Sequence, residues 1–166
     1  MNIASHKLAE TEYPSHFKGY VALVPGGDVL TVLREQADAT CELLRTLPES
    51  KGGFRYAPGK WSVRELVGHV IDTERIFAYR ALCFARGDTT PLPGFTEGDY
   101  VSHASFDERT LDDLAAEFAV VRAATLSLFA HLDSAAWERK GIASENEVSV
   151  RALAHIIAGH EWHHRG

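Results

Sequence analysis

The sequence has little cysteine, no excess of basic residues and no long apolar run, and each shortage excludes a class of protein. Its 166 residues include only two cysteines, too few for the disulfide framework of a small secreted protein. Cys41 and Cys83 both lie in apolar helical patterns, so we expect buried, reduced thiols and a cytoplasmic location. The net charge of −6 argues against a nucleic-acid partner, because phosphate binding requires a concentrated basic surface.

Apolar residues are plentiful but form no long uninterrupted run. They make up 45% of the chain, yet no run approaches the roughly 18 residues that a membrane-spanning helix requires. No membrane partner is therefore expected. The first residues also lack an apolar core flanked by basic residues, so we predict no signal peptide. We interpret residues 1–166 as a single domain that begins with an irregular segment over residues 1–25.

Four segments show the three–four spacing of apolar residues that is typical of helices, and none alternates as a β-strand does. Good capping residues begin three of them: Asp28, Ser62 with Glu65, and Ser105 with Glu108. The predicted helices cover residues 28–48, 62–86, 105–132 and 149–166. Four amphipathic helices around one core predict an all-α four-helix bundle.

The connections between these helices also carry information. The loop of residues 88–106, between the second and third helices, is long enough to cross over the bundle, so a simple up-down-up-down topology is not assured. It contains Phe95, Tyr100 and Phe106, and we expect these aromatic residues to order it by packing. Residues 141–148 are interpreted as a polar connector.

The last helix places histidine where a core would ordinarily have leucine. Leu153, Ile156, Ile157, His160 and His164 form one stripe, and the two histidines lie one turn apart on it. Burying an imidazole without partners costs about 1–3 kcal/mol. A metal ion would satisfy both rings at once, because stacked imidazoles on a helix are a common metal-binding arrangement. The best third ligand is His69, inside the wide apolar face of the second helix.

Two alternatives remain open at this point. His163 lies three residues after His160 and shares its face, so it competes with His164 as a ligand. The run from His160 to His164 also matches the H-E-x-x-H motif of zinc peptidases, in which the glutamate is the general base. A peptidase is disfavoured because its third ligand lies downstream and no sheet is predicted to hold a peptide. Glu161 is then either a solvated helix residue or a base or outer partner near the metal.

Two charged residues of the second helix have two interpretations each. Asp72 either orients the imidazole of His69 or is a surface carboxylate near Arg75 or Arg80. Arg80 either meets an anionic substrate or pairs with an acidic residue of a helix surface. His155 is expected on another face of the last helix, and four further histidines are expected at the surface: His6, His16, His103 and His131.

Several ordered motifs resemble the DinB-like (YfiT-like) metalloenzyme family. They are Ala57-Pro58-Gly59-Lys60-Trp61-Ser62, Gly68-His69-Val70-Ile71-Asp72-Thr73-Glu74-Arg75, the loop of residues 91–97, and Gly159-His160-Glu161 with His163-His164. The resemblance implies a four-helix bundle, often dimeric, with a crossover between the second and third helices. It also implies a divalent metal held by His69, His160 and His164, and so selects His164 over His163. The last helix of the family usually continues for several turns, so a longer helix is expected here.

Three neutral imidazoles leave a divalent ion with its full charge and an open position, as in catalytic rather than structural sites. The resemblance implies thiol-dependent transfer with bacillithiol, mycothiol or glutathione, or isomerisation. We therefore expect a metal-dependent transferase that uses a low-molecular-weight thiol and a small-molecule substrate. The alternatives are a hydrolase using metal-bound hydroxide and a non-catalytic, stress-related metal-binding protein. Zinc or nickel is expected, with iron as an alternative, and the protein is expected to be a homodimer.

Overall fold

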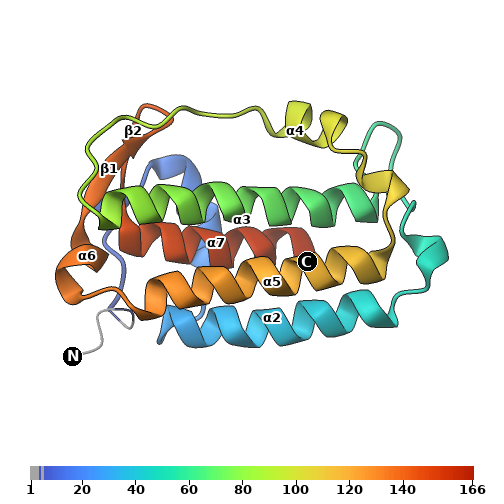
Figure 1. Ribbon diagram of the computed structural model, residues 1–166, viewed down its shortest axis with the longest axis horizontal. Helices are drawn as coiled ribbons and strands as arrows, with labels where there is room; N and C mark the ends of the chain where they lie inside the picture. Colours follow the sequence, from blue (N-terminus) through green and yellow to red (C-terminus); the bar gives the residue numbers. More distant parts are fainter. Residues whose placement is uncertain (1–3, 5) are drawn as a thin grey trace.

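Long helices lying side by side dominate the computed structural model, which describes residue 4 and residues 6–166 (Figure 1). The four that form the bundle are α2 (Val29–Thr46), α3 (Val63–Ala85), α5 (Leu111–Ala130) and α7 (Val150–Arg165). The shorter helices are α1 (Lys18–Leu23), α4 (Glu97–His103) and α6 (Ser134–Glu138), and the strands are β1 (Lys140–Ala143) and β2 (Asn146–Ser149). The predicted all-α four-helix bundle is confirmed, with a small sheet added.

The crossover after α3 decides the topology of the bundle. Residues 86–110 run back along the outside of α3 before the chain enters α5 (Figure 1). As a result α3 and α5 run in the same direction, and so do α2 and α7. The predicted long crossover is confirmed. It contains α4 and a short 3-10 turn at Phe106–Glu108, and the buried Phe106 side chain helps to order it.

Two of the three predicted helix caps form as expected. The Asp28 carboxylate accepts a hydrogen bond from the Leu30 amide at the start of α2. The Ser62 hydroxyl accepts one from the Glu65 amide, and the Glu65 carboxylate accepts one from the Ser62 amide, which completes a capping box. A serine cap also begins α7, where Ser149 accepts from the amide of residue 152.

The capping box predicted at Ser105 is wrong. This residue has the left-handed φ of 51°, and α5 begins later, at Leu111, with Thr110 as its cap. The segment that follows Ser105 closes the end of α3 instead. The ring of Phe106 lies over Gly68, and the Asp107 carboxylate accepts a hydrogen bond from the Ser62 hydroxyl.

The polar connector predicted for residues 141–148 is instead an antiparallel hairpin of β1 and β2. Its two-residue turn places Ser144 and Glu145 at φ of 50° and 64°, as in a type I′ turn. Such turns favour Asn-Gly, so Ser144-Glu145 is a weak signal for one. The crossover also joins the hairpin, because the Leu92 amide donates to the Ile142 carbonyl and the Ser144 amide donates to the Leu92 carbonyl.

Helix α7 is the central helix rather than one amphipathic helix among four. All of residues 152–161 are buried, because α7 packs against α1, α2 and α3. The irregular segment predicted for residues 1–25 therefore contains a helix with a structural role, α1, which covers one face of α7. Three aromatic residues of the segment over residues 1–25 pack on the core as expected: Tyr13, Phe17 and Tyr20.

Buried apolar side chains form two clusters along the bundle. One contains Val70, Ile71, Leu114 and Phe118, and the larger one contains the second halves of α3 and α5 with most of α7. Charged residues are buried where α3 and α5 pass from one cluster to the other. Among the described residues, no helix is long and apolar enough to cross a membrane.

Candidate metal centre

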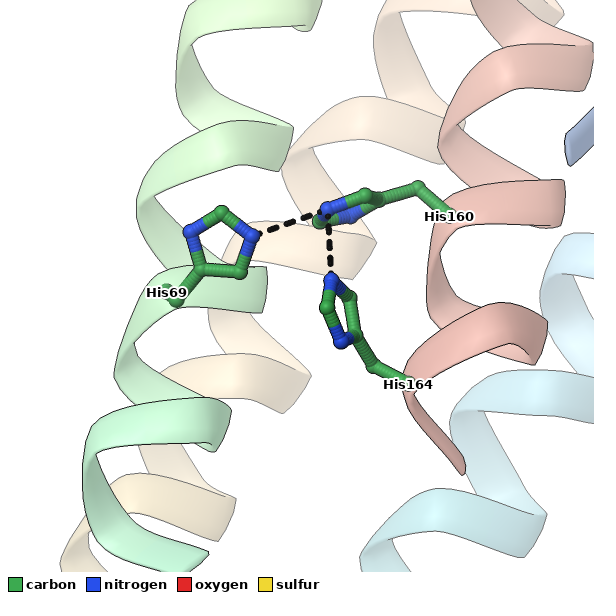
Figure 2. Close-up of side chains that lie close together, drawn as sticks. All are labelled: His69, His160 and His164. Atoms are coloured by element: carbon green, nitrogen blue, oxygen red, sulfur yellow. Dashed lines mark hydrogen bonds between the residues drawn. The ribbon is translucent and has the colours of Figure 1, made fainter. Parts of the chain in front are cut away.

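Three imidazoles from two helices point at one another in the middle of the bundle (Figure 2). His69 projects from α3, and His160 and His164 project from consecutive turns of α7. The Nε2 atom of His160 lies 3.0 Å from Nε2 of His69 and 3.1 Å from Nε2 of His164. One ring nitrogen of each histidine lies within 4.8 Å of the other two. The sequence prediction that these three side chains converge is therefore met.

The arrangement fits a metal ion by the chemistry of its donors. Three nitrogens bound to one zinc ion at about 2.0–2.1 Å would lie about 3.3 Å apart in tetrahedral geometry. The two nitrogen–nitrogen distances seen here need to open by only a few tenths of an ångström. No carboxylate or thiol belongs to the group. Three imidazoles without an anion suit zinc, nickel, copper or iron rather than calcium or magnesium.

The surroundings keep these rings neutral, as ligands must be. Burial lowers the pKa of His69 from 6.5 to about 4. Burial also lowers the pKa of His164 to about 4, helped by the neighbouring histidines His69 and His163. The pKa of His160 lies well below its usual value for the same reasons, with burial the largest. At neutral pH each imidazole therefore has one ring nitrogen with a lone pair available to an ion.

Aromatic side chains hold two of the rings in place. The Trp61 ring lies 4.7 Å from that of His69, and the Tyr20 ring lies edge-on to His160 at 5.4 Å. The second nitrogen of His69, Nδ1, lies 3.4 Å from the Thr73 hydroxyl one turn along α3. Thr73, which the sequence analysis did not single out, thus occupies the position that an outer partner of a metal-bound histidine takes.

A glycine precedes a histidine in each motif, and the structure gives the reason. A Cβ on Gly159 would lie 2.1 Å from the Tyr20 carbonyl oxygen, and a Cβ on Gly68 would lie 2.4 Å from the Phe106 ring. Contacts this short do not occur, so only glycine allows these segments to pack so closely. The close packing of α1 on α7 and of the crossover on α3 is thereby fixed one residue away from His160 and His69.

Glu161 is not the solvated residue that one interpretation expected. It is 2% exposed, and its carboxylate accepts hydrogen bonds from Arg122, at 2.6 Å, and from the Thr40 hydroxyl. Arg122 also forms a two-pronged ion pair with Glu74, at 2.8 and 2.9 Å. We call Glu74, Arg122 and Glu161, with Thr40, the carboxylate–arginine cluster. Both oxygens of Glu161 are therefore occupied by residues other than the three histidines.

The remaining polar residues of α3 lie away from the imidazoles. Asp72 is partly exposed and pairs with Arg75 at 3.5 Å, which supports the surface interpretation. Burial raises the pKa of this carboxyl. Arg80 is buried and donates to the Pro93 carbonyl and the Ser144 hydroxyl, so its expected pairing with a helix-surface acid is not found in the described part of the chain.

The other histidines lie outside the group of three. His163 is exposed, with its ring 4.9 Å from that of His164. His155 faces another side of α7, as expected, and is buried beside the Arg151 carbonyl. Four further histidines are exposed, as predicted: His6, His16, His103 and His131.

His164 borders two cavities. One, of about 670 Å³, is lined by the aromatic residues Phe54, Tyr56 and Trp61, and also by Lys60. Phe54 and Tyr56 are largely exposed, at 56% and 73%, so this cavity opens to solvent. The other, of about 200 Å³, is mostly apolar and lies between α2, α3 and α7. The larger one is within the 300–1,000 Å³ usual for small-molecule sites.

Comparisons with solved structures recover the same architecture. YfiT from Bacillus subtilis, described as a probable metal-dependent hydrolase with an unusual four-helix bundle topology, matches with a TM-score of 0.75 at 15% identity. The match covers 98% of this chain and 89% of YfiT. A mycothiol-dependent maleylpyruvate isomerase matches with a TM-score of 0.70 at 15% identity, over 87% of this chain and 60% of that one.

A DinB-like protein of Bacillus subtilis matches with a TM-score of 0.58 at 22% identity, over 83% of this chain and 84% of the other. A search among curated protein sequences gave no match. At these identities the structural matches show the fold alone. The sequence itself matches the family model of the DinB superfamily over residues 33–166. The chain therefore belongs to the DinB superfamily.

Proposed function

We propose that this protein binds one divalent metal ion through His69, His160 and His164 and is a metal-dependent enzyme that uses a low-molecular-weight thiol. The observation that carries the proposal is the convergence of three neutral imidazole nitrogens, with nitrogen–nitrogen distances of 3.0 and 3.1 Å. A divalent ion bound there would lower the pKa of a coordinated thiol or water to about 7 or below. Zinc or nickel is proposed, with iron as the alternative.

Two features favour a thiol over water as the nucleophile. A hydrolase of the H-E-x-x-H type needs a free glutamate as general base, but Glu161 is fixed by Arg122 and Thr40. A thiol needs less help, because its ordinary pKa of about 8.5 is already near neutral pH. The cavity of about 670 Å³ beside His164 also has room for a thiol cofactor together with an electrophile.

The residues of this larger cavity would bind and orient the reactants. Trp61 offers a flat apolar surface next to His69. The Lys60 ammonium, which lies over the Tyr56 ring at 5.7 Å, would meet an anionic group of the cofactor. His69 and His160 are each only 3% exposed, which limits the access of water to these two rings. The mycothiol-dependent isomerase with the same fold supports this proposal by analogy.

A metal-dependent hydrolase is the second candidate, and the description of YfiT favours it. The two differ in what they consume, since one transfers a thiol sulfur to an electrophile and the other adds water. A non-catalytic metal-binding protein remains the third. We further propose a homodimer in the cytoplasm. The family resemblance supports the dimer, and the two free cysteines support the reducing compartment.

The test combines metal analysis with a thiol titration. Protein loaded with zinc or nickel and protein treated with a chelator are titrated with glutathione by calorimetry, and bacillithiol and mycothiol follow. Binding that depends on the metal supports the proposal. His163→Ala, which changes an exposed neighbour, serves as the control for His160→Ala. Metal-dependent ester hydrolysis without any thiol binding would favour the hydrolase instead.

A further inference from the structure

Two arginines are buried among the described residues, Arg80 and Arg122, and they differ in whether a carboxylate neutralises them. Arg122 is neutralised by Glu74 and Glu161. Arg80 is 4% exposed, yet no carboxylate of the described residues lies within ion-pair distance of it. It lies eleven residues after His69 on α3, which is about 16 Å along the helix, so it is not part of the group formed by His69, His160 and His164, which we call the histidine centre.

The protein uses only one nitrogen of this guanidinium. Nη2 of Arg80 donates to the Pro93 carbonyl at 2.9 Å and to the Ser144 hydroxyl at 3.0 Å. The rings of Phe77 and Phe95 lie 5.5 and 5.8 Å from its central carbon. Its Nε and Nη1 have no acceptor among the described residues, and neither atom is sealed from solvent. Their three N–H donors are therefore left for a ligand.

These donors belong to a cavity of about 300 Å³ between α3 and the crossover. Apart from Arg80 its walls are largely aromatic and apolar, and include Tyr79, Phe95 and Tyr100, with Arg75 as the other arginine. Arg75 is already engaged by Asp72 and Glu117. The cavity therefore combines flat apolar walls with a single uncompensated positive charge.

An anion is the ligand that this arrangement lacks. A buried charge without a counter-charge is costly, and burial lowers the pKa of Arg80. A guanidinium edge with free N–H groups matches the two oxygens of a carboxylate or phosphate. The rings of Phe95, Tyr79 and Tyr100 would accompany a flat apolar group attached to that anion.

We propose that this cavity is a second small-molecule site, which binds a carboxylate or phosphate carried on a flat apolar group. Arg80 supplies the recognition of the anion, and the crossover supplies the apolar wall. Because Arg80 also holds Pro93 and Ser144, ligand binding here would stiffen the contact between α3, the crossover and the hairpin. The site is independent of the histidine centre.

Benzoate, phenyl phosphate and the neutral isostere benzamide test the proposal on the wild-type protein, by calorimetry and by thermal shift. We expect benzoate or phenyl phosphate to bind at least about tenfold more tightly than benzamide, as the loss of a charged hydrogen bond would predict. The more tightly bound of the two identifies the anion as carboxylate or phosphate. If benzamide binds as tightly as both anions, the proposal is overturned, and this comparison needs no variant.

Variants then locate the binding. Arg80→Gln should weaken the tighter anion by about tenfold or more, whereas Arg86→Gln, which removes an exposed arginine near the end of the same helix, should leave it unchanged. Chelation of metal and His160→Ala should also leave it unchanged. Unaltered binding in folded Arg80→Gln, or loss of binding in His160→Ala, would place the anion elsewhere and refute the proposal.

Discussion

His160 and Glu161 are consecutive residues of α7, yet they belong to two buried polar clusters of opposite character. In the carboxylate–arginine cluster, donors meet acceptors: the Arg122 guanidinium lies between the carboxylates of Glu74 and Glu161. In the histidine centre, the Nε2 atoms of three neutral imidazoles face one another, and the group includes no carboxylate.

The difference separates a structural role from a binding role. A polar cluster whose groups are all partnered fixes one arrangement of the helices that supply it. Here those helices are α2, α3, α5 and α7, because Arg122 also donates to the Leu33 carbonyl and Thr40 donates to Glu161. In the group of three histidines, Nε2 of His160 faces two other ring nitrogens but has either one N–H or one lone pair, so it can form only one good hydrogen bond with them. A shared cation would bind all three nitrogens at once. Substitutions in either cluster should separate the two roles.

The largest effect on stability is expected in the carboxylate–arginine cluster. Arg122→Met would leave two carboxylates buried without a counter-charge and should lower the free energy of unfolding by about 3–5 kcal/mol. Adding Glu74→Gln and Glu161→Gln to the same chain should restore much of that loss. Urea unfolding followed by circular dichroism measures both. A loss below about 1 kcal/mol for Arg122→Met would contradict the claim that Arg122 neutralises two buried carboxylates.

The next largest effect, on metal affinity, is expected in the histidine centre. His160→Ala should weaken zinc or nickel binding by more than about 100-fold, since changes to outer partners of a metal site already cost 10–100-fold. Its stability without metal should change much less than that of Arg122→Met. Chelator competition gives the affinities, with His163→Ala as the matched control. Equal losses in both variants would mean that His163 shares the ion.

A glycine substitution tests how strongly the packing of α1 supports the site. Gly159→Ala places a Cβ against the Tyr20 carbonyl and should cost about 1–3 kcal/mol of stability, as overpacking does. Metal affinity should fall as well, because His160 is the next residue. Gly19→Ala on α1 is the control, since a Cβ there meets nothing within 4 Å. Thermal unfolding and metal titration of both variants decide the matter.

A smaller effect should distinguish Thr73 from Asp72. Thr73→Val removes the hydroxyl beside Nδ1 of His69 and should weaken metal binding by roughly tenfold. Asp72→Asn changes a carboxylate that pairs with Arg75, so the metal affinity should hardly move. The same chelator competition measures both. The reverse ranking would restore Asp72 as the residue that orients His69.

The smallest change is expected in the dependence of metal affinity on pH. Three imidazoles with the ordinary pKa of about 6.5 would lose roughly 1,000-fold between pH 7.5 and 5.5, because protons compete with the ion. With the pKa of His69 and His164 near 4 and that of His160 well below 6.5, the affinity should change less than about threefold. A steep fall in this range would show that the rings are not buried as described.

The lowered pKa values of His69 and His164 also make the stability of the metal-free protein depend on pH. Between pH 6.5 and about 4 the unfolded chain takes up protons that the folded, metal-free protein does not, so its stability should fall as the pH is lowered through this range. Bound metal should raise the midpoint of thermal unfolding at each pH where it binds. Thermal scans of the metal-free and metal-loaded protein provide this comparison.

The sequence predicted the features that depend on periodicity. Spacing of three and four placed His160 and His164 on the inward stripe of α7, and the capping box at Ser62 marked the start of α3. The hairpin escaped prediction because its strands have four residues each and its turn, Ser144-Glu145, lacks the usual glycine. The start of α5 was misplaced because Phe106 packs on Gly68, and no local signal reveals such a distant contact.

The carboxylate–arginine cluster shows why burial was harder to predict than helix position. One of the two interpretations of Glu161 left it in solvent, but its carboxylate faces Thr40 of α2 and Arg122 of α5 inside the bundle. A signal did exist. Glu74 and Arg122 each lie three or four residues from a buried aromatic residue, Phe77 and Phe118 respectively, and opposite charges at such inward positions of two helices predict an ion pair.

The most direct measurement is an X-ray absorption spectrum of the purified protein loaded with one equivalent of zinc or nickel. We predict three imidazole nitrogens at about 2.0–2.1 Å with the remaining coordination supplied by oxygen, or by sulfur once a thiol is added. The spectrum of His160→Ala should lose that three-imidazole pattern. A wild-type ion surrounded by oxygen alone, or a spectrum that His160→Ala leaves unchanged, would contradict a metal centre built from His69, His160 and His164.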